Sequence, residues 1–413
     1  MSYNEIQRCR ISGSTNLIPV LNLGKMSMTG VFPKPGEKVP SGPMNLVFCP
    51  DSGLVQLRQS YSLDEMYGDN YGYRSGLNDS MVKHLTGITQ KLQKLHPLDA
   101  ESAVLDIGGN DGTLLKAYDV AGLERICVDP TVDKWLAYYG GTDIKTIASF
   151  FPTPGLNGKF FDIITSISCF YDLEDPNDFV NGISQSLKAD GIWHFEQSYL
   201  PAMIAANSYD TVCHEHLEYY TFKVVEELLA KHGLRVIDVE QNNVNGGSFA
   251  VTAAHAESNY AVNTAAIRRI RETEAFFNEN PLGVLKEFES RVMWHRNQLT
   301  SLIRNLNESG KSVAACGAST KGNVLLQYAN LTRDDIAYVA DVNPNKHGCV
   351  TPGTKIPIVS EADARKMPTD YKLVLPWHFR RGIIQREAEF LNAGGFLIFP
   401  LPHIEIVGAE ALL

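Results

Sequence analysis

A cluster of histidine and acidic side chains occurs near the middle of the chain, in the segment SYDTVCHEHLEYYT (residues 208–221). His214, Glu215 and His216 follow one another directly, between a predicted strand and the next predicted helix. Catalytic groups often gather there, at the carboxyl ends of a parallel sheet. A histidine oriented by a neighbouring acid can work as a general base with a pKa of about 6 to 7.

Two other interpretations of this cluster are a zinc site and a polar packing loop. Zinc could be bound by the two histidines with Glu215, but His-x-His needs a third ligand and differs from the HExxH helix of metalloproteases. The cluster could also be a polar loop that helps to pack a domain boundary. Proton abstraction fits the residue types better than either alternative.

A glycine-rich turn follows the predicted strand AVLDI (residues 103–107) and precedes a predicted helix. Because glycine lacks a Cβ atom, the backbone of such a turn can approach a ligand closely. Asp129 ends the next strand, 23 residues after Asp106, where a carboxylate would meet ribose hydroxyls. A tight turn without any ligand is the alternative.

The spacing of the turn distinguishes two cofactors. A dinucleotide site has the pattern G-x-G-x-x-G, whereas this turn reads Asp106-x-Gly108-Gly109-x-x-Gly112. An acidic residue at the strand end suits the positively charged methionyl end of S-adenosylmethionine (SAM) better than a pyrophosphate. The spacing resembles motif I of class I methyltransferases.

A second glycine loop, GASTKG (residues 317–322), joins a predicted strand to a helix near the C-terminus. It is not a Walker A motif, because Lys321 precedes the second glycine. Its backbone amides, the hydroxyls of Ser319 and Thr320, and Lys321 could hold a diphosphate. The alternative is a turn in a purely structural domain. Asp341 lies where a dinucleotide fold would bind ribose, but full NAD binding is doubtful without G-x-G-x-x-G.

The histidine-rich segment and the two glycine turns are positioned by apolar strands that alternate with helix-length stretches. From about residue 81, the segments AVLDIGG, RICVDP, DIITSISCF and GIWHFEQ predict a parallel sheet covered on both faces. The segments LRVIDVE and SFAVTAAH, with a turn at residues 245–247, could close that sheet as a hairpin. Strand and helix alternation restarts after a helical stretch at 262–309. The fold class is therefore α/β.

Three domains are expected. Residues 1–80 are rich in glycine, proline and serine and predict a small, loop-rich domain. Residues 81–256 form the Rossmann-like domain with the first glycine turn. Residues 257–413 form a helical connector and a second Rossmann-like, nucleotide-binding domain.

Composition excludes several classes of partner. The 413 residues include 37 basic and 47 acidic side chains, for a net charge of -10, so nucleic acid and membrane surfaces are unlikely partners. Seven cysteines without paired spacing do not form a disulfide framework, and no signal peptide or membrane-spanning run is evident. A cytoplasmic location is expected. The oligomeric state stays open, and a monomer is plausible.

Several long motifs in order resemble one family, the SAM-dependent C-methyltransferases that act on TDP-linked 4-keto-6-deoxyhexoses in deoxysugar biosynthesis. The resemblance covers nearly the whole chain. It rests on the segments DEMYGDNYGYRSGLN, DIGGNDGTLL, FEQSYL, SYDTVCHEHLEYY, NGGSF, GASTKGNVLLQY, PGTKIPI and LVLPWHF.

The resemblance implies roles for individual residues. His216 corresponds to the proposed base and Glu215 to its neighbour in the site. A tyrosine near the sugar corresponds to Tyr73 or, as a second choice, to Tyr71. The predicted catalytic residues are His216, Glu215, Tyr73 and His214, and the predicted substrate-binding residues are Tyr71, Tyr220, Asn245, Ser319, Thr320, Lys321 and His378.

The same resemblance implies the SAM site. Asp129 would bind the adenosyl ribose, and Ser168 and Cys169 would lie beside the methionyl portion. The predicted SAM-binding residues are Asp106, Gly108, Gly109, Asn110, Gly112, Asp129, Pro130 and Ser168.

The N-terminus departs from the family pattern. Many relatives begin with a zinc domain that carries two CxxC motifs. Here the second cysteine of each motif is a serine, at Ser12 after Cys9 and at Ser52 after Cys49. Neutral serine is a poor zinc ligand, so no metal is expected.

Our leading hypothesis is methyl transfer from SAM to the carbon next to the ketone of a TDP-4-keto-6-deoxyhexose, at C3. His216 would remove the proton there, and Tyr73, His214 and Tyr220 are candidates to steady the enolate oxygen. O- or N-methylation of a sugar or another metabolite is the nearest alternative. An NAD-dependent sugar oxidoreductase and a catalytically silent nucleotide-sugar binder are two more distant ones.

Overall fold

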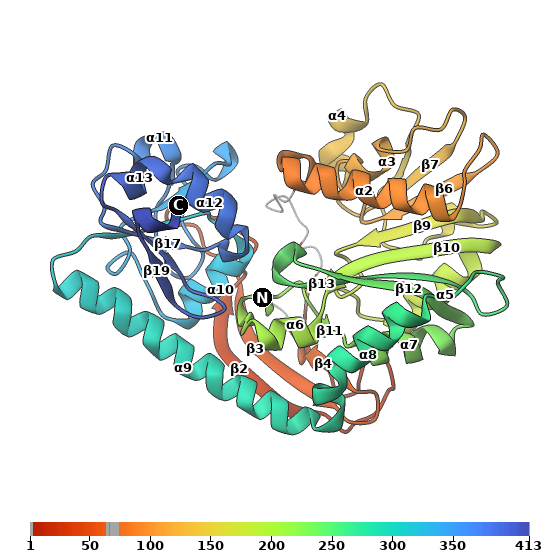
Figure 1. The fold of residues 1–413 in the computed structure, drawn as a ribbon, viewed down its shortest axis with the longest axis horizontal. Coiled ribbons are helices and arrows are strands. Elements are labelled where there is room, and N and C mark those ends of the chain that lie inside the picture. Colours follow the sequence, from red (N-terminus) through yellow and green to blue (C-terminus); the bar gives the residue numbers. More distant parts are fainter. Residues whose placement is uncertain (1–2, 63–65, 67–73, 413) are drawn as a thin grey trace.

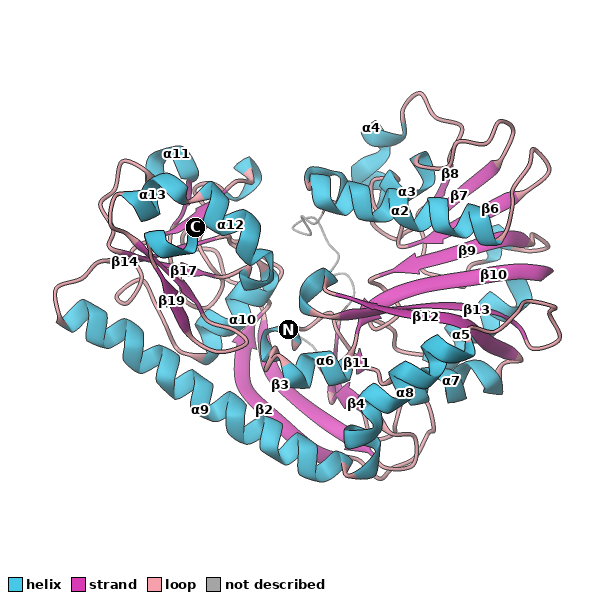
Figure 2. Ribbon diagram, viewed as in Figure 1, coloured by secondary structure: helices cyan, strands magenta, loops and turns pink. Residues whose placement is uncertain are grey.

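The computed structural model describes residues 3–62, 66 and 74–412. A Rossmann-like domain lies on the right of Figure 1, and a second α/β domain, in blue, lies on the left. The red strands of the N-terminal module lie between them at the bottom, and the long helix α9 (Pro281–Glu308) runs beneath. Mainly parallel strands flanked by helices (Figure 2) confirm the predicted α/β class.

The larger domain contains a seven-stranded sheet in the order β12-β13-β10-β9-β6-β7-β8. Six strands run in the same direction, while β13 lies antiparallel between β10 and β12. The predicted hairpin at the sheet edge is therefore confirmed. The strands are β6 (Ala103–Ile107), β7 (Glu124–Val128), β8 (Lys145–Ile147), β9 (Phe161–Ile167), β10 (Leu187–Ser198), β12 (Leu234–Asn242) and β13 (Ser248–His255).

Helices cover both faces of this sheet. Helix α2 packs on one face through apolar residues three, four and seven positions apart, including Leu85, Ile88 and Leu92. Helices α5, α7 and α8 contribute apolar residues to the core on the other face. The helices of this domain and its flanks are α2 (Asp79–Leu95), α3 (Thr113–Lys116), α4 (Leu136–Tyr139), α5 (Pro176–Ser186), α6 (Leu200–Ala205), α7 (Phe222–Lys231) and α8 (Thr264–Glu279).

The C-terminal domain has a six-stranded sheet in the order β16-β15-β14-β17-β18-β19. The strand order reverses between β14 and β17, and ligands of open α/β sheets bind at such a point. The strands are β14 (Val313–Cys316), β15 (Val339–Asp341), β16 (Ile358–Ser360), β17 (Tyr371–Val374), β18 (Phe396–Phe399) and β19 (Glu405–Val407), and the helices are α10 (Thr320–Tyr328), α11 (Glu361–Ala364), α12 (Arg380–Arg386) and α13 (Ala388–Asn392).

The N-terminal module is tied to the other two domains. Its antiparallel strands continue into β11 (Glu218–Tyr219), which belongs to the histidine-rich segment and pairs with β4. Its apolar side chains share one core with α9, α10 and α12. The strands of the module are β1 (Tyr3–Glu5), β2 (Ile18–Ser27), β3 (Ser41–Cys49), β4 (Leu54–Leu57) and β5 (Gln59–Tyr61).

A buried ion pair reinforces the junction between the module and β11. The Arg10 Nε atom lies 3.6 Å from Glu218 Oε1, and both side chains are almost completely shielded from solvent. The Arg10 guanidinium also donates hydrogen bonds to the carbonyl oxygen of Leu57 (2.7 Å) and to Ser60 Oγ (2.8 Å). The position of β11 therefore depends on contacts that start near the N-terminus.

Helix α8 holds the segment that follows β11. The carboxylate of Glu274 is fully buried and accepts hydrogen bonds from the backbone amides of Phe222 (2.7 Å) and Lys223 (2.9 Å) and from the hydroxyl of Tyr199 (3.0 Å). These bonds satisfy amides of the first turn of α7, which otherwise lack partners.

Among the described helices, none combines the length and apolar composition that a bilayer crossing requires.

Replacement of Arg10 by alanine tests the junction. We expect Arg10→Ala to lower the free energy of unfolding by about 3 kcal/mol, because the carboxylate of Glu218 is left buried without its counter-charge. Urea unfolding followed by circular dichroism would measure the loss. The exposed Arg381 is a matched control, and equal stability of Arg10→Ala and Arg381→Ala would contradict this account.

Candidate active site

One cavity of about 460 Å³ collects most of the predicted site residues. It is lined by the carboxyl ends of the central strands of the larger domain and by the loops that follow β14 and β17. We call it the central cavity. The predicted residues that line it are Asp106, Gly108, Gly109, Asn110, Asp129, Pro130, Ser168, Glu215, His216, Asn245, Ser319, Thr320, Lys321 and His378.

Two acidic side chains shape one end of the central cavity. Asp106 is 3% exposed and accepts a hydrogen bond from Thr165 Oγ1 at 2.6 Å. Burial, together with the neighbouring carboxylate of Asp129, raises the pKa of Asp106 to about 7. A cationic ligand would favour the ionised form of this carboxyl group. The carboxyl groups of Asp106 and Asp129 therefore fit the positively charged methionyl end of SAM.

Asp129 holds the backbone of the glycine turn. One carboxylate oxygen accepts a hydrogen bond from the amide of Asn110 at 2.8 Å, and the other accepts one from the amide of Thr131 at 2.6 Å. Gly112 does not line the cavity but precedes α3 with a φ of +72°, where a Cβ atom would lie 2.7 Å from the ring of Tyr139. Its predicted role in SAM binding is therefore the shape of the turn and not a lining contact.

Backbone amides of a preceding segment bind to the same turn. The amide of Ser75 donates to Asn110 Oδ1 and the amide of Gly76 donates to Asp111 Oδ2, both at 3.0 Å. Asp111 also forms an ion pair with Arg74, which lines the central cavity. The predicted tyrosines at positions 71 and 73 lie outside the described residues.

The geometry of His216 leaves one ring nitrogen available as a base. Its Nδ1 atom lies 2.8 Å from the carbonyl oxygen of Thr211. A carbonyl group can only accept, so we assign the ring proton to Nδ1 and the lone pair to Nε2. The ring also packs edge-on against Tyr171, with 4.4 Å between ring centroids.

Burial changes the protonation of His216. It lowers the pKa of His216 to about 4, and the nearby Lys321 ammonium adds to this effect. The sequence predicted an ordinary pKa of about 6 to 7 for this base. The structure corrects that expectation, because a partly buried imidazole loses hydration that would stabilise its cation. His216 is therefore neutral throughout the neutral pH range.

Glu215 lies beside His216 in the central cavity and is 9% exposed. Burial raises the pKa of its carboxyl group, while hydrogen bonding to the Cys213 side chain opposes that shift. Its carboxylate occupies the space where a Cβ atom of Gly30 would lie. A glycine of the N-terminal module thus makes room for this side chain.

Two predicted residues lie away from the central cavity. His214 is fully buried, and its ring packs against Tyr61 with 4.8 Å between ring centroids. Tyr220 stacks on Phe170 at 5.3 Å within the apolar core. Neither residue lines the cavity. Because the surrounding sheets enclose both rings, their predicted contacts with the substrate or its enolate oxygen are not supported by this geometry.

The C-terminal domain contributes the other end of the cavity. Ser319 is the N-cap residue of α10, and its hydroxyl accepts a hydrogen bond from the Gly322 amide at 3.0 Å. The Lys321 ammonium donates to the carbonyl oxygen of Asn245, which comes from the other domain. Burial lowers the pKa of Lys321, and burial with the Lys321 charge lowers the pKa of His378 to about 3.

Three further residues in the cavity were not identified from the sequence. Asp172 and Tyr171 follow β9, only a few positions after Ser168, and Arg74 precedes α2. Asp172 and Tyr171 could have been found, because they continue the segment at the carboxyl end of a parallel strand. No spacing in the sequence indicates Arg74.

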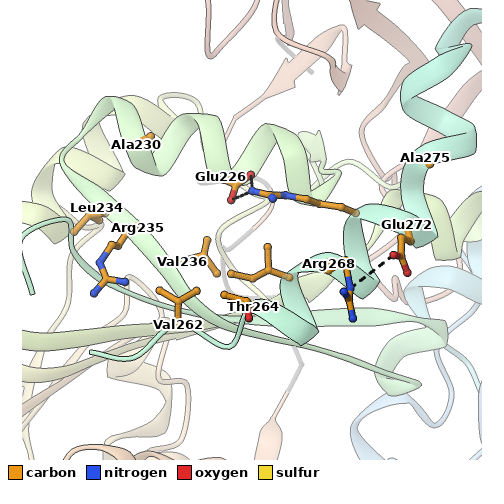
Figure 3. Close-up of a pocket in the computed structure, with 12 residues that line it drawn as sticks. Glu226, Ala230, Leu234, Arg235, Val236, Val262, Thr264, Arg268, Glu272 and Ala275 are labelled. Atoms are coloured by element: carbon orange, nitrogen blue, oxygen red, sulfur yellow. Dashed lines mark hydrogen bonds and ion pairs between the residues drawn. The ribbon is translucent and has the colours of Figure 1, made fainter. Parts of the chain in front are cut away.

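A separate surface groove of about 760 Å³ lies between α7, β12 and α8 (Figure 3). Its rim carries an ion pair between Arg271 and Glu226 at 2.7 Å, and apolar residues such as Val236 form its floor. The groove contains none of the described residues that the sequence identified as site candidates.

Comparison with known proteins gives three family matches. The models are described as “Putative zinc binding domain” (residues 9–67), “Methyltransferase domain” (residues 81–239) and “C-methyltransferase C-terminal domain” (residues 243–402). The C-methyltransferase NovU of Streptomyces niveus is 29% identical over 423 residues, covering 99% of this chain and 98% of NovU.

Solved structures show weaker likenesses. The PH0226 protein of Pyrococcus horikoshii is 17% identical with a TM-score of 0.37, covering 47% of this chain and all of that one. A SAM-dependent methyltransferase of Clostridium acetobutylicum is 12% identical with a TM-score of 0.35, covering 42% of this chain and 92% of that one. The matched methyltransferase domain and the seven-stranded sheet, rather than these likenesses, identify the class I methyltransferase fold.

Removal of the Asp129 carboxylate should weaken SAM binding. We expect Asp129→Ala to lose about 1 to 3 kcal/mol of binding free energy, because a hydrogen-bond acceptor and the backbone order of the turn are both lost. Titration calorimetry with SAM would measure this loss. The exposed Asp133 lies on the same segment, so Asp133→Ala serves as the control. Unchanged affinity in Asp129→Ala would refute the assignment.

Proposed function

This chain is a SAM-dependent C-methyltransferase, and we propose that it methylates the carbon next to the ketone of a TDP-linked 4-keto-6-deoxyhexose, at C3. One observation carries the proposal. A histidine with an available Nε2 atom, the SAM turn and a loop suited to a diphosphate all line the same cavity. We also propose a cytoplasmic location, since all seven cysteines are free thiols.

Methylation of carbon requires a base, because the acceptor carbon must first lose a proton. A C–H bond beside a carbonyl group is acidic enough for a positioned imidazole to remove that proton. His216 is neutral at neutral pH, so its Nε2 atom can accept the proton without first losing one. SAM, when bound, supplies an electrophilic methyl group that the enolate carbon takes up as S-adenosylhomocysteine leaves.

The negative charge that develops on the ketone oxygen needs a hydrogen-bond donor. Glu215 lies beside His216 in the cavity and would fill this role in its protonated form, which burial favours more than water does. Tyr73 stays a second candidate from the sequence. His216 would thus act as base while its neighbour in the chain stabilises the oxygen.

The nucleotide end of the substrate fits the C-terminal side of the cavity. Ser319, Thr320 and Lys321 lie at the point where the strand order of the second sheet reverses. Lys321 is a partly buried cation there, and a diphosphate would replace the carbonyl oxygen of Asn245 as its partner. A local positive group is needed, because the whole chain carries a net charge of -10.

The identity of the base can be tested by hydrogen exchange as well as by turnover. We expect His216→Asn to bind SAM and TDP-sugar normally but to lose about 100-fold or more in kcat. Deuterium exchange at the carbon beside the ketone should fall in parallel, since it needs deprotonation but no methyl transfer. The exposed His403→Asn is the matched control.

The outcomes separate different mechanisms. Exchange that continues in His216→Asn while methylation stops would place the base elsewhere in the cavity. No exchange in the wild-type protein, with methylation of a hydroxyl or amine, would indicate O- or N-methylation instead. The wild-type rate should rise with pH through the pKa of His216 at about 4 and stay level across the neutral range, because only neutral imidazole accepts a proton.

Lys321 tests the binding of the nucleotide. We expect Lys321→Ala to raise KM for the TDP-sugar by about 10-fold or more and to leave the affinity for SAM unchanged, because it removes a charge from the C-terminal domain only. Steady-state kinetics and SAM titration would measure the two effects. Lys366 on the surface of the same domain is the control position. A fall in SAM affinity alone would show that the two ligands have been assigned to the wrong ends of the cavity.

A further inference from the structure

Two short turns of the N-terminal module face each other where zinc modules hold their metal. The first runs from Cys9 to Gly13 and the second from Cys49 to Gly53, and each is closed by a hydrogen bond from the glycine amide to the cysteine carbonyl oxygen (2.9 and 2.8 Å). Each turn contributes one thiol and one hydroxyl group, from Cys9, Ser12, Cys49 and Ser52. We call these four side chains the serine–cysteine tetrad.

The members of the tetrad pair across the two turns. Cys9 Sγ lies 3.2 Å from Ser52 Oγ, and Cys49 Sγ lies 3.5 Å from Ser12 Oγ. Both distances are within the range of hydrogen bonds that involve sulfur. Each turn is thus bonded to the other by two crossed contacts, and the two thiols are buried, with exposures of 3% and 0%.

These four side chains do not fit a structural zinc ion. Such a site uses four thiolate or imidazole ligands, and a neutral serine hydroxyl is a poor replacement for a thiolate. Within residues 3–62, 66 and 74–412, no group of three or more His, Cys, Asp or Glu side chains is placed to hold a metal ion. The chain therefore disagrees with the zinc-domain model that it matches.

We propose that the crossed serine–cysteine hydrogen bonds replace the zinc ion, so that the N-terminal module folds and is held in place without metal. Other contacts hold the same turns. Ser14 Oγ donates to Asp51 Oδ2 at 2.5 Å, which links the first turn to the second. The side-chain amide of Asn177, on α5, donates to the carbonyl oxygens of Arg10 (3.2 Å) and Ile11 (3.0 Å).

The energetic reason lies in the packing of the module. A small isolated domain usually needs a metal or disulfides, because it buries too little apolar surface. This module is not isolated, since its strands share a core with α9, α10 and α12 and continue into β11. Binding of a metal is therefore not needed as a source of folding free energy, which it is in independent zinc modules.

The wild-type chain gives the first test. After purification without added chelator, and again after dialysis against EDTA, elemental analysis should find far less than one zinc ion per chain. The unfolding midpoint and the rate of methyl transfer should be the same before and after dialysis. A stoichiometric zinc ion, or a lower midpoint in EDTA, would overturn the proposal.

Restoration of the missing thiols gives the second test. The double variant Ser12→Cys/Ser52→Cys should bind one zinc ion per chain and unfold at a higher temperature with zinc than with EDTA. Ser290→Cys/Ser309→Cys, with the same number of added thiols on exposed positions at or near α9, should show neither effect. If the folded tetrad variant binds no more zinc than this control, the two turns are not arranged as proposed.

The hydrogen bonds themselves are tested by their removal. Ser12→Ala/Ser52→Ala should lower the unfolding midpoint of the metal-free protein, whereas Ser290→Ala/Ser309→Ala should leave it within error of the wild type. An unchanged midpoint in the first variant would show that the contacts do not hold the turns. If the cysteine variant fails to fold, the wild-type metal content and this pair of variants still decide the question.

Discussion

The buried contact between Arg10 and Glu218 connects the start of the chain to the histidine-rich segment that carries His216. Glu218 stands two residues after His216 and begins β11, which pairs with β4 of the N-terminal module. His216 therefore gains its position from a strand that extends the sheet of another domain. Loss of Arg10 would be costly, because it would leave the carboxyl group of Glu218, whose pKa burial already raises well above its usual range, without its cationic partner. The geometry of the cavity depends on this junction.

The cavity brings together groups of opposite charge from different folding units. Asp106 and Asp129 lie at the end of the class I sheet, and Lys321 enters from the second sheet. SAM is a cation and a nucleoside diphosphate is an anion, so the two ends suit different ligands. The rim is shared as well, because Gly30 of the N-terminal module makes room for Glu215. Each domain alone would present only part of this surface.

Burial has opposite effects on the two neighbours in the histidine-rich segment. It lowers the pKa of His216 and raises that of Glu215, because both groups lose the hydration of their charged forms. His216 is thus neutral at neutral pH, while burial shifts Glu215 towards its protonated form. The turns at Cys9 and Cys49 pack their thiols into the core of the methyltransferase domain, and this contact supports our proposal that the module is held without zinc.

The sequence by itself determined the features that depend on local pattern. Alternating apolar segments predicted the parallel sheet and its closing hairpin, and the spacing of Asp106, the glycine turn and Asp129 predicted the SAM site, because strand period and turn chemistry act over a few residues. Only the tertiary structure showed that His214 and Tyr220 do not line the cavity. Both are as polar and as close to the base as any true site residue, yet Tyr61 and Phe170 from distant segments enclose them. Packing between segments far apart in the chain also set the pKa of His216 and brought Arg74 to the cavity, and no local pattern records such contacts.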